Sequence, residues 1–504
     1  MHIVSSVKII DGKVFFKVFD CFESCDAVAS VYFFPSESDP LISVGHVFVR
    51  TDWPDMTTLF SQADILTAGS DGAGVLPVPK SAFDSDGIVT TARVAAYRTS
   101  PSARRGLGHV EETAARRLER LGLQEVATSD LVAQPTAPLS ETQGVFARFT
   151  ALGLTAAYFR DESRIAAARG ALQDDFEVVT NFSLALPTRL RAPGTSPMHA
   201  TSMPVGTGWP TASGIDTAHR QNVRGAGVLV GVLDTGIDAD HQQFHARTIP
   251  FRYVSFDPNN PASPPRDVRG FDLDGHGTHV CGIIAGSTVG VAPEAELVVA
   301  SVIESETART SLIRVVYGLN WLLHEFKAPA NATKPAVVNL SLGFPSTGVL
   351  NVPLKEYKTR LRAMEAVLNL LIQADVLPIV AIGNDGPGRF GYPGGFRNAL
   401  GVGAVDHGGV IAPFSGSRTS SRTRKPDIYG YGVGIYSSLE RDMANQSIYG
   451  RLDGTSMAAP FVAGIAALYL CRSRMSAAAL RTILLTNAQT VRTGRRSALI
   501  ARYV

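Results

Sequence analysis

Five short apolar runs in the second half of the chain constrain the fold more than any other feature. They are VLVGVL, LVVAS, AVVNLSL, LPIVAI and ALGVGAV, and stretches with helical patterns lie between them. Strands that are apolar on both faces and alternate with helices are typical of a buried parallel sheet wrapped by helices. We therefore expect an α/β domain with a mostly parallel central sheet at about residues 205–504.

Polar residues follow several of these runs. Asp234 comes directly after VLVGVL, and Asn384 follows LPIVAI within GNDG. His276 and Ser456 each stand at the expected start of a helix, in DGHGTHVCGIIAG and GTSMAAPFVAG. Because chemistry in such sheets gathers just beyond the carboxyl ends of the strands, we expect these four side chains to meet.

The four residue types suit nucleophilic catalysis. A serine hydroxyl is a weak nucleophile, so it needs a neutral imidazole that takes its proton and later returns it to the leaving amine. A buried carboxylate such as Asp234 would orient His276 and stabilise the imidazolium. A carboxamide N–H of Asn384 and the backbone N–H of Ser456 would stabilise the oxyanion that forms during attack.

Seven motifs in one order carry a resemblance to a known family: DTGID, HGTHVCG, GVAPEAEL, NLSLG, IGNDG, GYPG and GTSMAAPFVAG. Together they resemble the subtilisin-like serine proteases (subtilases, peptidase family S8) over about residues 205–504. The resemblance implies the three-layer subtilisin-like fold and a serine endopeptidase, a hydrolase that works through an acyl-enzyme. It assigns the catalytic triad to Asp234, His276 and Ser456, and the oxyanion donor to Asn384.

The resemblance also implies where a peptide substrate binds. Phe344 stands where relatives commonly have a second glycine, which should reshape one pocket. The primary specificity pocket has small or apolar walls, with Asp385 at its rim, so we expect a preference for apolar or aromatic side chains before the cut bond. The substrate-binding positions are Ser341, Leu342, Gly343, Gly383 and Gly391.

No cofactor is required by this scheme, and calcium stays an open alternative although the usual ligand of its strong site is not matched. Many relatives carry an aspartate after DTGID that ligates a strongly bound calcium ion, whereas this chain has Gln243 at the matching place in ADHQQF. Cys21 and Cys25 lack the second pair that a zinc site needs, and the four cysteines are too scattered for a disulfide scaffold.

The structure and role of the first 205 residues are harder to predict from the sequence. Residues 1–130 have short Val-, Ile- and Phe-rich runs and are predicted to be mainly β, with an unknown role. Residues 140–190 show a strand, strand, helix, strand pattern, and a Pro-, Gly- and Ser-rich linker covers 188–205. Two interpretations stay open: an inhibitory α+β prosegment that the enzyme cuts off in the linker, so that the chain is a zymogen, or a permanent accessory domain.

Composition limits the partners. With 47 basic and 45 acidic residues the formal charge is only +2, so no nucleic acid or anionic membrane is expected as a partner. No membrane span is expected, and the start MHIVSSVKIIDGKVFFKVFD does not read as a signal peptide. This favours a cytoplasmic or non-classically exported protein, whereas the resemblance favours secretion.

The expected partners are protein or peptide substrates and the chain's own prosegment. Two classes of function remain for the whole chain: an active endopeptidase, and a pseudoprotease or peptide-binding module that keeps only the substrate groove.

Overall fold

A computed structural model describes most of the second half of the chain and parts of the first. After residue 207, the residues outside the description are 255–265, 268, 273, 304–309, 346–353, 420–423, 443 and 494–495. Before residue 208, the described segments are 2–10, 13–21, 27–34, 42–43, 74–79, 114–127, 144–152, 154–159, 165–172, 176–180, 183–184, 190–191 and 198–199. Cys25, most of the linker and the side chain of Phe344 therefore lie outside the described residues.

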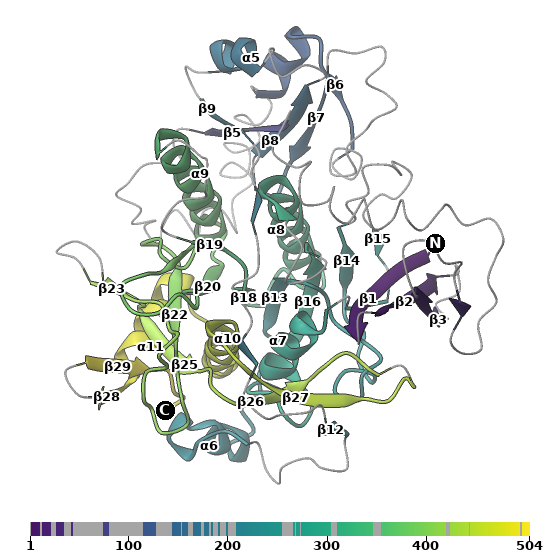
Figure 1. Cartoon of the computed structure of the whole chain (residues 1–504). Coiled ribbons are helices and arrows are strands. Elements are labelled where there is room, and N and C mark those ends of the chain that lie inside the picture. The colour runs from purple at the N-terminus through teal and green to yellow at the C-terminus, as the bar shows by residue number, and fades with distance from the viewer. Residues whose placement is uncertain are drawn as a thin grey trace.

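A ten-stranded sheet forms the centre of the protein, in the order β15-β14-β16-β13-β18-β20-β22-β25-β29-β28 (Figure 1). Its pairs are parallel except for the two outermost ones, β15–β14 and β28–β29. The predicted α/β class with a mostly parallel sheet is thus confirmed. The strands are β13 (Leu229–Asp234), β14 (Phe251–Tyr253), β15 (Arg266–Asp267), β16 (Glu296–Ser301), β18 (Ala336–Leu340), β20 (Leu377–Ala381), β22 (Leu400–Val405), β25 (Ile428–Tyr431), β28 (Gln489–Thr493) and β29 (Arg496–Ile500).

Helices cover both faces of this sheet and make the three layers. Side chains alternate between the faces of a strand, and β13 shows this: Val230 and Val232 belong to one apolar cluster, Leu229 and Leu233 to another. The first cluster includes helices α7 (His276–Ala285), α10 (Thr455–Arg472) and α11 (Ala477–Thr486). The second includes α8 (Leu312–Lys327) and α9 (Leu354–Gln373).

Helix α10 is the central helix of the first layer. By length and composition it would be able to cross a membrane, and no other helix among the described residues would. However, 89% of this stretch is buried inside the protein. A helix that is apolar all round is the pattern expected for a helix enclosed by the core of a large domain.

Shorter elements complete the part of the structure after residue 207. The hairpin of β26 (Ile435–Ser438) and β27 (Ile448–Asp453) leads directly into α10. The remaining elements are η5 (Thr211–Ser213), α6 (Ile215–Arg220), β17 (Thr310–Ser311), β19 (Phe344–Pro345), β21 (Gly391–Tyr392), β23 (Arg418–Thr419) and β24 (Arg424–Lys425).

Two further sheets come from the first 200 residues. One has the order β1-β2-β3-β4, and the other β6-β7-β8-β5-β9. The elements β7, β8, α5 and β9 follow the strand, strand, helix, strand order predicted for residues 140–190, while β5 joins their sheet from residues 74–79. The bounds are β1 (His2–Ile10), β2 (Lys13–Cys21), β3 (Ala27–Phe34), β4 (Ile42–Ser43), β5 (Gly74–Pro79), β6 (Gln124–Glu125), β7 (Gly144–Phe149), β8 (Leu154–Phe159), α5 (Ile165–Leu172), β9 (Phe176–Thr180), β10 (Ser183–Leu184), β11 (Leu190–Arg191) and β12 (Met198–His199).

Candidate active site

Three elements that touch one another carry the predicted triad. Asp234 is the last residue of β13, His276 is the first residue of α7, and Ser456 is the second residue of α10. Helix α10 packs against both α7 and β13, and α7 also contacts β13. The fold therefore packs together three elements whose predicted triad residues are up to 222 positions apart in the chain (456 minus 234).

Asp234 and His276 form a short buried hydrogen bond. His276 Nδ1 lies 2.6 Å from Asp234 Oδ1, and the two residues are 2% and 0% exposed. The backbone N–H of Thr235 also donates to Asp234 Oδ1, at 2.8 Å. Because a carboxylate only accepts hydrogen bonds, it holds the proton of the neutral imidazole on Nδ1 and leaves Nε2 as a base.

The start of α7 is fixed against the end of β13 by close backbone packing. The N–H of Gly277 donates to Thr235 Oγ1 at 2.8 Å. A Cβ on Gly277 would lie only 2.2 Å from the carbonyl oxygen of Gly236. Glycine at 277 therefore lets the His276 ring approach the carboxylate of Asp234.

Ser456 is buried, and its hydroxyl is not used by the surrounding fold. It is 3% exposed, and its Oγ has no hydrogen-bond partner among the described residues. A direct bond from Ser456 Oγ to His276 is therefore not formed in this geometry. Such bonds are often long in proteases without substrate and shorten when substrate binds.

Asn384 is oriented by the residue before Ser456. Its Oδ1 accepts hydrogen bonds from the backbone N–H and from the hydroxyl of Thr455, both at 2.9 Å. Because an N–H only donates, the carboxamide oxygen must face Thr455 and the Nδ2 group must face away. A Cβ on Gly454 would lie 3.4 Å from that Nδ2, which places the amide beside the first turn of α10.

The predicted substrate-binding positions surround this turn. Ser341 Oγ donates to the carbonyl of Ser456 at 3.3 Å, and the N–H of Gly383 donates to Thr455 Oγ1 at 3.1 Å. A Cβ on Gly343 would lie 2.3 Å from the carbonyl oxygen of Tyr392, so two backbones approach closely here. Leu342 is buried, and the N–H of Gly391 donates to the carbonyl of Ile382 at 2.6 Å.

Several residues that order the site were not singled out as such from the sequence. Thr235 and Thr455 form hydrogen bonds with neighbours of the predicted catalytic side chains, as described above. Asp272 is buried and accepts hydrogen bonds from the N–H and the hydroxyl of Thr278, both at 2.6 Å, and burial raises the pKa of its carboxyl. The only feature of the sequence that could have indicated a role for Thr455 in the site is its position next to Ser456.

Cys281 lies one turn beyond His276 on α7 and is fully buried. Burial, with the nearby carboxylates of Asp234 and Asp272, raises the pKa of its thiol well above the usual range. Since the thiolate is the reactive form, burial makes this cysteine a poor nucleophile.

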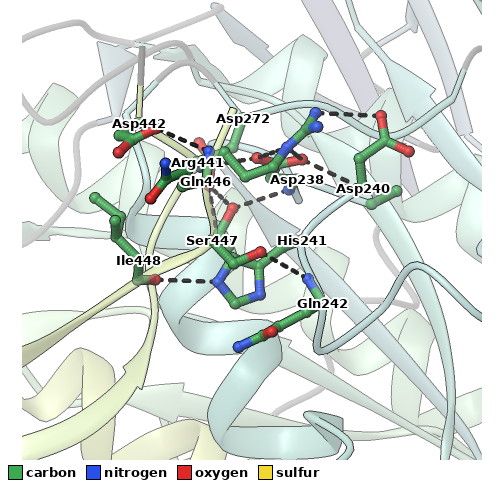
Figure 2. A network of polar contacts seen from close by, with 12 residues as sticks. Asp238, Asp240, His241, Gln242, Asp272, Arg441, Asp442, Gln446, Ser447 and Ile448 are labelled. Carbon is green, nitrogen blue, oxygen red and sulfur yellow. Dashed lines mark hydrogen bonds and ion pairs between the residues drawn. The ribbon is translucent and has the colours of Figure 1, made fainter. Parts of the chain in front are cut away.

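A polar network joins the segment after β13 to the connection between β26 and β27 (Figure 2). The backbone N–H of Arg441 donates to Asp238 Oδ2 at 2.9 Å, and its Nε donates to the same carboxylate at 3.0 Å. Arg441 Nη2 also reaches Asp240, at 3.2 Å. Asp238 is therefore more than a local turn residue, because it ties two loops beside the triad.

His241 belongs to the same network and is buried as a neutral ring. Its Nδ1 accepts from the N–H of Gln243 at 3.2 Å, so its Nε2 carries the proton and donates to the carbonyl of Ile448 at 3.0 Å (Figure 2). Burial lowers the pKa of His241 to about 4, although the bond to Ile448 and the charge of Asp238 act in the opposite direction.

This burial predicts a loss of stability in acid. Between pH 6.5 and about 4 the unfolded chain protonates His241 and the folded protein does not, so the free energy of unfolding falls as the pH drops. The contribution of His241 should be about 3 kcal/mol over this window. Urea unfolding at pH 7 and at pH 4.5, carried out on a Ser456→Ala background, should show this difference. His241→Gln should lose this part of the pH dependence; an unchanged dependence would contradict the assignment.

Comparison with known proteins places the chain in a family. The family model described as the subtilase family matches residues 225–500. The subtilisin-like protease PopC of Myxococcus xanthus is 49% identical over 370 residues, which cover 72% of this chain and 78% of that protein. Subtilisin Savinase of Lederbergia lenta is 35% identical over 256 residues, covering 50% of this chain and 79% of that protein.

A third relative is the major intracellular serine protease of Bacillus subtilis, 31% identical over 258 residues, covering 49% of this chain and 70% of that protein. The family match spans the triad-bearing elements and all ten strands of the central sheet. The chain belongs to the subtilase family and is a serine endopeptidase.

Proposed function

We propose that the protein hydrolyses peptide bonds through an acyl-enzyme on Ser456, with Asp234, His276 and Ser456 as its catalytic triad. The observation that carries the proposal is the buried 2.6 Å Asp234–His276 bond, together with a serine hydroxyl that no described residue uses, on the helix α10 that packs against both β13 and α7. The family accounts for protein substrates; the roles of these particular residues rest on the geometry.

The first half of the reaction forms an ester. Ser456 Oγ attacks the peptide carbonyl carbon while His276 Nε2 takes the hydroxyl proton, and Asp234 stabilises the imidazolium. The carbonyl oxygen becomes an oxyanion that Asn384 Nδ2 and the Ser456 N–H stabilise. In the first turn of a helix that N–H has no intrahelical acceptor, and the helix dipole favours negative charge there.

The second half restores the enzyme. The C–N bond breaks when His276 returns the proton to the leaving amine, which leaves the acyl group on Ser456. Water then attacks the ester, with His276 again as the base, and the Ser456–acyl bond breaks to release the acid and the free hydroxyl. Each proton is returned, so no cofactor is consumed in this scheme.

A fluorophosphonate probe separates this enzyme from a pseudoprotease that keeps only the groove. The probe reacts with a serine only when an adjacent base and oxyanion donors activate it. We expect it to label the tryptic peptide that carries Ser456 and to leave Ser456→Ala unlabelled. A folded wild-type protein that takes up no label would favour the binding module.

The primary specificity pocket should prefer apolar or aromatic side chains before the cut bond. Its proposed walls, residues 341–343, 381–384 and 391–393, contain no acidic side chain, so a buried lysine or arginine would lack a partner. Asp385 follows them and is exposed at the rim, where it would tolerate some basic residues. A peptide library cleaved by the purified enzyme tests this expectation. Strict cleavage after arginine or lysine would contradict it.

We further propose that residues 140–190 act as a prosegment. The turn after β7 docks on α8: the N–H groups of Ala151 and Leu152 both donate to Asn320 Oδ1, at 2.9 and 3.3 Å. The rings of Phe149 and Tyr317 pack edge to face, with centroids 6.4 Å apart. These side chains belong to the same apolar cluster as α8 and α9, so the docked sheet is continuous with the core of the catalytic domain.

The chain that follows leads toward Ser456. Strand β10 pairs antiparallel with β17, and β11 pairs antiparallel with β27, where Leu190 lies opposite Asp453. Asp453 is three positions before Ser456, so the start of the linker pairs with the strand that leads into Ser456. Backbone pairing of this kind is how an extended peptide is held in a groove.

Self-processing should follow from this placement. In side-by-side expression, the wild type should yield a product that begins between about Leu186 and Trp209, and Ser456→Ala should not. Intact mass and N-terminal sequencing over time measure both. A wild type that is fully active while it stays at full length would instead support the permanent accessory domain.

A further inference from the structure

The side chain of Gln243 is buried at a junction of loops close to the triad. It is 2% exposed. Its Oε1 accepts from the N–H groups of Thr288 and Val289, at 2.9 and 3.4 Å, and from the hydroxyls of Ser287 and Thr288, at 3.3 and 3.2 Å. Its Nε2 donates to Thr288 Oγ1 at 2.8 Å and to the hydroxyl of Tyr449 at 2.7 Å. Both ends of the carboxamide are therefore engaged.

These groups do not fit a calcium ion, which the resemblance to subtilases would place here. Calcium needs six to eight oxygen ligands. Around Gln243 two backbone N–H groups point inward at Oε1, and Nε2 is itself a donor, so the positive ends of dipoles face the place that a cation would take. The described residues also contain no group of three or more His, Cys, Asp or Glu side chains that would hold a metal.

The space is filled by the loop itself. Residues 286–290 turn tightly around the carboxamide, and a Cβ on Gly286 would lie 3.0 Å from Gln243 Oε1. The N–H of Gly290 donates to the carbonyl of Gly286 at 2.9 Å, which closes the turn. The main chain of Gln243 takes part as well, because its carbonyl accepts from the N–H of Ser287 at 3.3 Å.

This one side chain joins the three segments that carry the proposed triad. Gln243 lies on the segment that follows Asp234. Residues 286–290 continue α7, which begins with His276. Tyr449 is fully buried on β27, the strand that leads into Ser456.

We propose that Gln243 does in this protein what a bound calcium ion does in its relatives: it fastens the loop after α7 to the segment after β13 and to β27, without a metal. The catalytic domain should then keep its fold in calcium-poor solution. The test measures stability and needs no turnover. Failure of the Gln243 proposal would therefore leave the acyl-enzyme proposal standing, and failure of the acyl-enzyme proposal would leave the Gln243 proposal standing.

Thermal unfolding of the full chain tests the tie. The background is Ser456→Ala, so that self-digestion does not interfere, and each protein is melted in excess chelator and in millimolar calcium. Gln243→Ala should lower the midpoint by about 5–10 °C in either solution, the scale expected when several buried hydrogen bonds are lost from a domain of this size. Gln221→Ala, at an exposed glutamine, is the matched control and should not shift it.

The response to calcium separates the tie from a metal site. If calcium raises the unfolding midpoint by binding at another site, the increase should be equal in the Ser456→Ala parent and in Gln243→Ala. A shift that is present in the parent and absent in Gln243→Ala would make Gln243 part of a calcium site and overturn the proposal. A midpoint of Gln243→Ala equal to that of the Gln221→Ala control would overturn it as well.

A milder variant covers the case in which Gln243→Ala does not fold. Tyr449→Phe keeps the buried ring and removes only the hydroxyl, which accepts from Gln243 Nε2 and also from Gln242 Nε2. It should lower the midpoint by a few degrees, equally in chelator and in calcium. A midpoint at the control value, or a drop that calcium alone reverses, would overturn the tie.

Discussion

Ser456→Ala is expected to lower kcat for peptide hydrolysis by about six orders of magnitude, the loss seen when the nucleophile of subtilisin itself is removed. The reason is that the variant keeps the groove and the oxyanion donors but has no atom that can form the acyl bond. The measurement is turnover of a chromogenic peptide by purified protein, with the unfolding midpoint recorded for each sample.

Ser473→Ala is a matched control, because this serine lies just after the end of α10 and is exposed. It should retain the activity of the wild type. Substantial peptidase activity in folded Ser456→Ala would mean that another group is the nucleophile, and the triad assignment would be wrong.

Asp234→Ala should lower kcat by about four orders of magnitude, somewhat less than loss of the nucleophile. Its carboxylate holds His276 Nδ1 at 2.6 Å inside a region closed to water. Without it the ring is free to turn, the proton is no longer held on Nδ1, and the imidazolium that forms during attack loses its stabilising charge. Steady-state kinetics at several pH values give kcat and KM separately.

KM should change much less than kcat in Asp234→Ala. Asp234 bonds Nδ1 of His276, on the side of the ring away from the catalytic Nε2, and has no role in holding the peptide backbone. Asp216→Asn, in the first turn of α6, is the control for loss of a carboxylate elsewhere. A loss of kcat of tenfold or less in well-folded Asp234→Ala would show that the orientation of His276 does not depend on this carboxylate.

The strands and the triad segments could be predicted because their signals are local. The apolar runs that became β13, β18, β20 and β22 are enclosed on both faces, so nearly every residue in them is apolar whatever its neighbours. The end of such a run marks the edge of the sheet. The sequence therefore predicts Asp234 at that edge, and the structure has it as the last residue of β13.

The contacts that order the site were beyond prediction because they join loops far apart in the chain. Arg441 lies 203 positions from Asp238, and Tyr449 lies 206 positions from Gln243. Loop side chains show no periodicity, so nothing near Asp238 in the sequence indicates an arginine partner. The mismatch at Gln243 was visible as a departure from the family, but the hydrogen bonds that replace the ion were not.

The order of strands in the N-terminal sheet was hidden for a related reason. Strand β5 inserts between β8 and β9 although it comes from residues 74–79. Residues 140–190 alone have the pattern of a complete strand, strand, helix, strand unit. The sequence of a strand does not show which distant strand pairs with it, so the insertion of β5 could not be predicted.

The central claim is a covalent acyl group on Ser456, and trapping that group tests it most directly. An activated ester substrate should give a burst of released alcohol close to one equivalent per enzyme, followed by slower turnover, because ester formation precedes hydrolysis. Acid quenching during the burst, digestion and mass spectrometry should find the acyl mass on the peptide that contains Ser456. Acyl mass on a different residue, or full turnover with neither a burst nor a trapped adduct under any quenching condition, would contradict the account.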